Sequence, residues 1–137
     1  MTGSLKLAAV GTVVAQRTFP ALGRDDLRRY AEASGDLNPL HLETAFARRA
    51  GFDDVIVHGM LGMALLGRLL TEAFPAQSLL HFRSRFRNVI PVGKAIVCEA
   101  TLTASDGRVA DLALAAATEG GPVAIEGAAR LLVESIS

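Results

Sequence analysis

An acid and an imidazole stand five positions apart in residues 34–42, which read SGDLNPLHL. Residues five apart on a regular helix point roughly 140° away from each other. Asp36 and His41 can therefore act on one target only if the helix ends between them. Pro39 favours that ending because it has no N–H to donate and disfavours the α conformation in the residue before it, while Gly35 permits backbone angles closed to other residues. The segment predicts a helix that stops and turns, with two proton-transfer groups aimed at one point.

The composition indicates one globular domain over residues 1–137. Half of the chain is hydrophobic and 20% is charged, which is typical of a protein with a core rather than of a disordered one. Fourteen Lys and Arg balance fourteen Asp and Glu. This balance argues against a strong electrostatic attraction to nucleic acid or to an anionic membrane, so we expect neither as a partner.

The cysteine and the apolar runs predict a cytoplasmic location. Cys98 is the only cysteine, which excludes an internal disulfide and fits a reducing compartment, and its place in an alternating run predicts a buried thiol. Residues 1–14 hold one Lys and no long apolar core, so we expect no secretory signal. The longest apolar stretch, residues 60–70, is shorter than the roughly 20 residues that span a bilayer.

The first half of the chain favours helices. Residues 13–19 form an expected first strand, and residues 24–33 have acids in the first turn and apolar residues at helical spacing, so they predict a helix that ends at Ser34–Gly35. A second short helix is expected over residues 43–50, closed by Gly51. Residues 58–70 are apolar on nearly every face and predict a helix buried all round.

The second half changes to a period of two. Residues 82–87 predict a strand whose two faces differ. One face holds Phe82, Ser84 and Phe86, and the other holds Arg83, Arg85 and Arg87. Strands are also expected over residues 95–104, 108–118 and 123–133, divided by Gly-containing turns. We therefore expect an α+β domain in which the long buried helix is wrapped by a curved antiparallel β-sheet.

Three segments together carry a resemblance to a known family. The first is the pattern of Tyr30, Ser34-Gly35-Asp36, Asn38-Pro39, His41 and Ala47; the others are residues 57–60, VHGM, and residues 88–93, NVIPVG. In this order they resemble the MaoC-like, (R)-specific enoyl-CoA hydratases and the mycobacterial-type 3-hydroxyacyl-thioester dehydratase subunits of fatty-acid elongation. The likeness extends over almost the whole chain, and its first segment is the most specific.

The resemblance implies a hotdog fold, with tunnels for acyl thioesters near a dimer interface that pairs two sheets edge to edge. The dimer is expected to be a homodimer, or a heterodimer with a second hotdog subunit. The implied reaction is reversible hydration of a trans-2-enoyl thioester to the (R)-3-hydroxyacyl thioester. It implies no cofactor and no metal, because coenzyme A or acyl carrier protein carries the substrate.

The resemblance also implies roles for site residues. His41 acts as base and Asp36 as its acid partner or as the holder of the water. Gly59, at the expected start of the long helix, offers a backbone N–H and the positive end of the helix dipole to the thioester oxygen. Four more residues are assigned to substrate binding, each with a plainer structural role as its alternative: Ser34, Asn38, His58 and Met60.

Two rival functions and two local questions stay open. The rivals are a hotdog thioesterase, which would hydrolyse the same thioesters, and a non-catalytic subunit that binds acyl chains and completes a heterodimer. His81 is expected to be structural, and the arginine stripe forms either a solvated outer face or a contact for carrier phosphates. Gly67 departs from the family, because some hydratases have there a serine that supports the catalytic acid.

Overall fold

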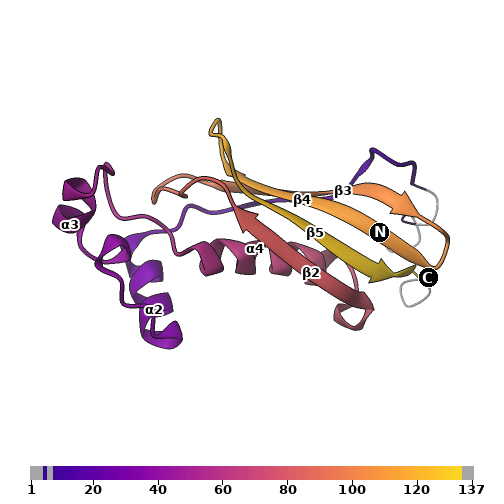
Figure 1. The fold of residues 1–137 in the computed structure, drawn as a ribbon, viewed down its shortest axis with the longest axis horizontal. Coiled ribbons are helices and arrows are strands. Elements are labelled where there is room, and N and C mark those ends of the chain that lie inside the picture. The colour runs from indigo at the N-terminus through magenta and orange to yellow at the C-terminus, as the bar shows by residue number, and fades with distance from the viewer. Residues whose placement is uncertain (1–4, 6–7, 134–137) are drawn as a thin grey trace.

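The computed structural model describes residues 5 and 8–133 and shows a single antiparallel sheet with one long helix along it (Figure 1). The strands lie in the order β1-β3-β4-β5-β2. Their bounds are β1 Val13–Phe19, β2 Leu79–Phe86, β3 Ile96–Ser105, β4 Val109–Thr118 and β5 Val123–Leu132. This confirms the expected α+β class and the bounds of β1, β3, β4 and β5 to within one residue, while β2 begins three residues before Phe82. The expectation about residues 1–14 lies partly outside the described residues.

The strand order differs from a simple meander at one edge. β3, β4 and β5 follow one another through tight turns, as expected, but β2 pairs with β5 and not with β3, while β1 pairs with β3 at the other edge. A period of two shows which side chains share a face, and it carries no information on which strand lies next to which. The sequence therefore predicted the strands but not the position of β2.

The core lies on the sheet face that α4 covers. Burial alternates along β3, with Ile96, Cys98, Ala100 and Leu102 all facing the core. The Cys98 side chain has no exposed surface, and this burial raises the pKa of its thiol to about 12. The predicted buried thiol is confirmed, and at neutral pH it is a protonated, unreactive group.

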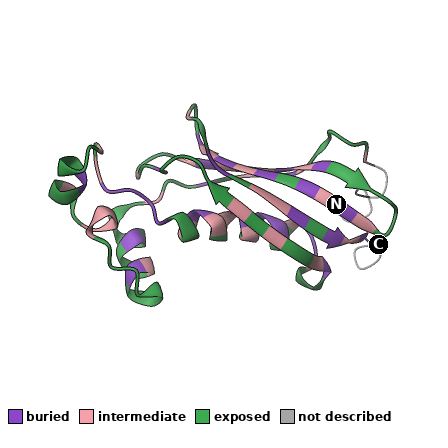
Figure 2. Cartoon of the chain, in the orientation of Figure 1, coloured by how far each residue is buried: buried purple, intermediate pink, exposed green. Residues whose placement is uncertain are grey.

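The long helix α4, Gly59–Ala73, is buried on one face only. Figure 2 shows buried, intermediate and exposed positions along this helix. Gly62, Leu66, Leu69 and Leu70 are buried against the sheet, while Met60 is 56% exposed. The expectation of a helix buried all round is wrong for the single chain, because the sheet covers only the side of the helix that faces it. Among the described residues, no helix combines the length and the apolar character needed to cross a bilayer.

Two short helices form a separate lobe beyond one end of the sheet, between β1 and α4 (Figure 1). They are α2, Arg24–Ser34, and α3, Thr44–Arg49, which match the two predicted short helices. Asp54 ties them together, since its carboxylate pairs with Arg24 of α2 and accepts a hydrogen bond of 2.9 Å from the Thr44 hydroxyl. A backbone N–H from Val55, followed by Thr44 and Arg24, holds the pKa of Asp54 below its usual value.

The helix glycines differ in how closely they are approached. A Cβ placed on Gly62 would lie 2.7 Å from Ile125 Cδ1 and 2.9 Å from Ile90 Cδ1, whereas one placed on Gly67 would meet only the Phe82 ring at 3.4 Å. The sheet therefore approaches the helix closely at Gly62. At Gly67 there is room for a methyl group.

We predict that Gly62→Ala and Gly67→Ala differ in stability although both replace a helix glycine by alanine. Both gain the same helix propensity, about 1 kcal/mol, but only the first forces the two isoleucines to move, at a cost of about 1–3 kcal/mol. Chemical denaturation should therefore find Gly67→Ala more stable by about that difference. Equal stabilities would contradict the packing described for α4.

Candidate active site

The loop after α2 positions the acid. Gly35 ends the helix in the left-handed conformation, with φ of 80°, as its place in the sequence predicted. Ser34 Oγ then accepts a hydrogen bond of 3.1 Å from the Asp36 N–H, and Asp36 Oδ1 accepts one of 3.3 Å from the Asn38 N–H. The side chain of Asp36 is thus held by its own turn and is 51% exposed.

A short 3-10 helix positions the imidazole. It runs over Pro39–His41, and Asn38 caps its start, with Asn38 Oδ1 accepting a hydrogen bond of 3.0 Å from the Leu40 N–H. The expectation that Pro39 ends a helix is wrong: the helix has already ended before Asp36, and Pro39 begins the next turn, a position where its fixed φ and missing N–H are favourable. Asn38 does lie outside the α region, with ψ of 125°, as a residue before proline should.

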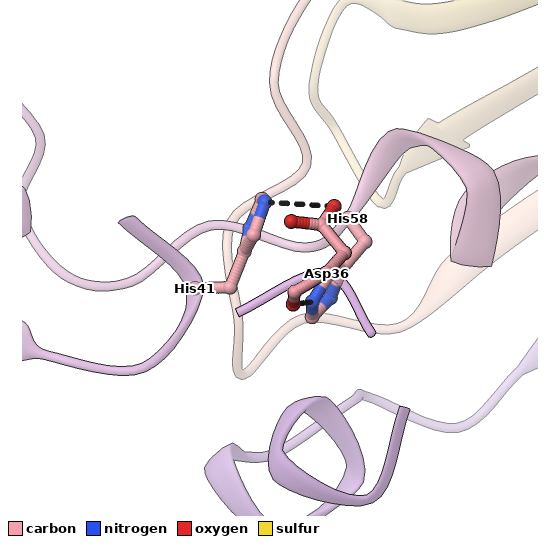
Figure 3. Close-up of side chains that lie close together, drawn as sticks. All are labelled: Asp36, His41 and His58. Carbon is pink, nitrogen blue, oxygen red and sulfur yellow. Dashed lines mark hydrogen bonds and ion pairs between the residues drawn. The ribbon is translucent and has the colours of Figure 1, made fainter. Parts of the chain in front are cut away.

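The ring of His41 is oriented by a backbone carbonyl. His41 Nδ1 lies 2.7 Å from the Ile56 carbonyl oxygen, which can only accept, so Nδ1 carries the proton and donates it. Nε2 of the neutral ring is then an unprotonated acceptor. It faces Asp36 Oδ2 at 3.9 Å, too far for a direct hydrogen bond (Figure 3). His41 Nε2 and Asp36 Oδ2, both proton acceptors, therefore face each other across this gap.

His58 lies beneath this pair and is almost completely buried. Its ring stacks on that of His41 with centroids 3.8 Å apart, and the edge of Tyr30 packs against it at 4.8 Å. His58 Nε2 lies 3.2 Å from the backbone oxygen of Asp36 (Figure 3). Burial is the main cause that lowers the pKa of His58, and the nearby His41 adds to it. A neutral His58 therefore donates its Nε2–H to Asp36.

Gly59 begins α4, as the sequence predicted, with His58 as the preceding cap residue. The first N–H groups of a helix have no partner within it and lie at the positive end of its dipole. A Cβ on Gly59 would lie 3.3 Å from the Phe86 ring. Glycine at this position therefore allows Phe86 of β2 to approach the start of α4.

A cavity of about 310 Å³ joins His41 to Gly59. Its walls are mostly apolar, and its polar contributions come from His41 and from the segment after β2. The other lining residues are Ile56, Val57, Phe86, Arg87, Asn88, Val89, Ile90 and Ile125. An apolar cavity with a few convergent polar groups is the usual form of a small-molecule site. The space beside His41 therefore suits an apolar ligand with one polar end.

A larger hollow of about 830 Å³ lies on the other face of the sheet, away from this pair. Arg83 and His81 line it, and they point away from Phe82, which faces α4 near Gly67. All three stripe arginines are exposed, and Arg87 also lines the smaller cavity. His41 and Gly59 line the smaller cavity and not this hollow, so we place the chemistry in the smaller cavity.

The same three side chains are the described group that could hold a metal ion. One ligand atom from each of Asp36, His41 and His58 lies within 4.8 Å of the others. However, the two imidazole planes are stacked and only 23° apart. Ring nitrogens bind metals along directions in the ring plane, at about 2.0–2.1 Å for zinc, and nearly parallel planes do not converge on one ion. The cluster suits proton transfer better than metal binding.

Of the sequence-assigned residues, only His41 and Gly59 line the cavity, and Asp36 lies beside it, 3.9 Å from His41 Nε2. The side chain of Met60 lies on the exposed face of α4, and Ser34 and Asn38 form hydrogen bonds within the turn. A Cβ placed on Gly67 would have no atom of Asp36 within 4 Å. Within one chain, Asp36 is therefore supported by its own turn and by His58, and not by position 67.

Three residues of the site were missed. The Ile56 carbonyl orients His41, and it left no signal in the sequence because any residue supplies a carbonyl. Tyr30 and Asn88 belong to the segments that carry the resemblance, and this membership could have marked them as site residues. Asn88 also donates a hydrogen bond of 2.8 Å to the Val123 carbonyl, which ties the cavity wall to β5.

Comparison with known proteins finds relatives of this domain. The family model described as MaoC like domain matches residues 6–119. A mitochondrial 3-hydroxyacyl-[acyl-carrier-protein] dehydratase of Arabidopsis thaliana is 36% identical over 94 residues, which are 69% of this chain and 55% of that protein. The chain thus spans little more than half the length of that relative.

Two further likenesses extend over most of the chain. An (R)-specific enoyl-CoA hydratase of Aeromonas caviae is 34% identical over 82% of this chain and 87% of its own length. The solved (R)-hydratase from A. caviae, described as involved in PHA biosynthesis, superposes with a TM-score of 0.79 at 32% identity, over 91% of this chain and 96% of that one. A chain of the ChsH1-ChsH2 complex from Mycobacterium tuberculosis has the same fold, with a TM-score of 0.78 at 15% identity over 91% of this chain and 98% of that one.

We predict distinct tautomers for the two stacked histidines. Nitrogen-15 NMR at neutral pH should find His41 protonated at Nδ1 and His58 at Nε2, because each of these nitrogens faces a carbonyl oxygen. A proton on Nε2 of His41 would contradict the orientation described here.

His58 should also stay neutral as the pH falls through 6.5, where a histidine in the unfolded chain takes up a proton. The unfolded state then binds more protons than the folded state, so His58 makes the protein less stable as the pH falls below about 6.5.

Proposed function

The chain belongs to the MaoC-like domain family, and from this premise we propose that it adds water reversibly across the 2,3 double bond of an enoyl thioester. The product is the (R)-3-hydroxyacyl thioester, and the carrier is coenzyme A or acyl carrier protein. The observation that carries this proposal is the unprotonated Nε2 of His41, which faces Asp36 at 3.9 Å and opens on the cavity that Gly59 also lines.

In the proposed reaction, His41 and Asp36 hold a water molecule between them. His41 Nε2 takes a proton from this water as its oxygen attacks C3, and the Asp36 carboxylate holds the second hydrogen and stabilises the imidazolium that forms. The electrons move through C2 to the thioester oxygen. The proton taken from water is the one that C2 then needs, so the pair returns it and no other reactant is consumed.

Gly59 is proposed to stabilise the negative charge on the thioester oxygen. Gly59 lies at the positive end of α4 and lines the same cavity as His41. A donor that is already in place where charge develops needs no rearrangement during the reaction. The residues that reach the reacting atoms are thus Asp36, His41 and Gly59, and the proposal includes no cofactor.

We expect Asp36→Asn and His41→Ala each to slow hydration of crotonyl-CoA by about 100-fold or more, because each removes one member of the proton-transfer pair. The reaction is followed as the loss of the conjugated enoyl absorbance. Asp53→Asn and His81→Gln are matched controls that remove the same group types elsewhere on the exposed surface, and they should retain the wild-type rate.

If both site variants are folded and as fast as wild type, the assignment of the pair is wrong. Release of free coenzyme A in place of a hydroxyacyl product would favour the hotdog thioesterase. A wild-type protein that binds enoyl thioesters without converting them would favour the non-catalytic subunit.

We further propose that the protein works in the cytoplasm as a homodimer, or as a heterodimer with a second hotdog chain. Apolar side chains remain exposed in the loop of Asp36, on α4, at the end of β2 and after it: Leu37, Met60, Phe86 and Val89. The outer edges of β1 and β2 have no neighbouring strand among the described residues. A partner would cover this surface and an edge that otherwise invites aggregation. A solution mass equal to one 14.4 kDa chain would contradict this proposal.

A further inference from the structure

His58 is a buried titratable group that the proposed reaction does not use. Only 1% of its surface is exposed, so it does not contact a ligand in the cavity, which its side chain does not line. Histidine is seldom fully buried without a reason, because both ring nitrogens then need partners. The neighbours of His58 indicate what that reason is.

The ring of His58 contacts both members of the proton-transfer pair. One face stacks on His41 with centroids 3.8 Å apart, and Nε2–H donates to the Asp36 backbone oxygen over 3.2 Å (Figure 3). The rings of Tyr30 and His58 also pack edge to face, with centroids 4.8 Å apart and an interplanar angle of 62°. His58 is therefore wedged between α2 and the two segments that carry the acid and the base.

The second ring nitrogen shows that packing alone does not explain this residue. His58 Nδ1 is buried and has no hydrogen-bond partner among the described residues. An unpaired buried polar atom destabilises a fold, and an apolar ring of similar shape would avoid this. Phenylalanine would stack on His41 equally well, but it has no N–H for Asp36.

We propose that His58 is a positioning residue for the Asp36–His41 pair. Its stacked ring fixes the plane of His41, so that Nε2 points at Asp36, and its Nε2–H fixes the backbone that carries the Asp36 carboxylate. This role rests on the proposed hydration reaction. It replaces the substrate contact that the sequence suggested for His58.

Two variants separate the two contacts. His58→Phe keeps a stacked ring and loses the hydrogen bond, whereas His58→Gln keeps an N–H donor and loses the stacking. Each should lower kcat for crotonyl-CoA by about 10-fold to 100-fold, the size of effect that small misplacements of catalytic groups produce. KM should change less than about threefold, because the cavity walls are unchanged. His81→Gln serves as the control histidine.

Thermal unfolding and a double variant separate positioning from simple structural support. His58→Phe should unfold close to the wild-type temperature, because removal of the unpaired Nδ1 offsets loss of the hydrogen bond to the Asp36 backbone oxygen. In a His41→Ala background the same substitution should lower the residual rate by less than it lowers the wild-type rate, since one of the two groups that His58 positions is gone. Equal losses in both backgrounds, together with a lower unfolding temperature, would overturn the proposal.

Two other results would also overturn it: wild-type kcat in both His58 variants, or a raised KM at unchanged kcat, which would indicate a substrate contact instead. Failure of the underlying function is distinguishable from either. In that case the wild-type protein itself gives no hydroxyacyl product, whatever residue stands at position 58.

Discussion

The hydrogen bond from His41 Nδ1 to the Ile56 carbonyl links the turn after α2 to the segment that leads into α4. It is 2.7 Å long and fixes which nitrogen carries the proton. Because Nδ1 is the donor, Nε2 is left as the acceptor that faces Asp36. Without this bond, nothing would determine which nitrogen of His41 faces Asp36, although the stacked ring of His58 would still hold the ring plane.

The lobe of α2 and α3 is held so that this bond can form. Asp54 pairs with Arg24 and accepts from Thr44, which fixes the chain just before Ile56. His58 then fills the space between α2 and the pair with a ring that contacts both. The site therefore depends on the lobe for its geometry and on the sheet for its cavity walls, such as Phe86 and Ile125.

Local chemistry was predictable from the sequence, and packing was not. Gly35 and Asn38 each favour one backbone conformation, so the turn around Asp36 could be predicted from residue types. The role of Pro39 was misjudged because proline ends one helix and begins another with equal ease. Tertiary features left no such mark: the place of β2 beside β5, the one-sided burial of α4, the Ile56 carbonyl and the stacking of His58 on His41 all depend on residues distant in sequence.

The proposed function requires that water attack C3 of an enoyl thioester and that the thioester bond stay intact. Incubation of the wild-type protein with crotonyl-CoA in water labelled with oxygen-18 tests it most directly, because the label records the carbon that water attacks. We expect one labelled oxygen in the 3-hydroxyl group of an intact (R)-3-hydroxyacyl thioester. Label in a free carboxylate, with coenzyme A released, would contradict the account.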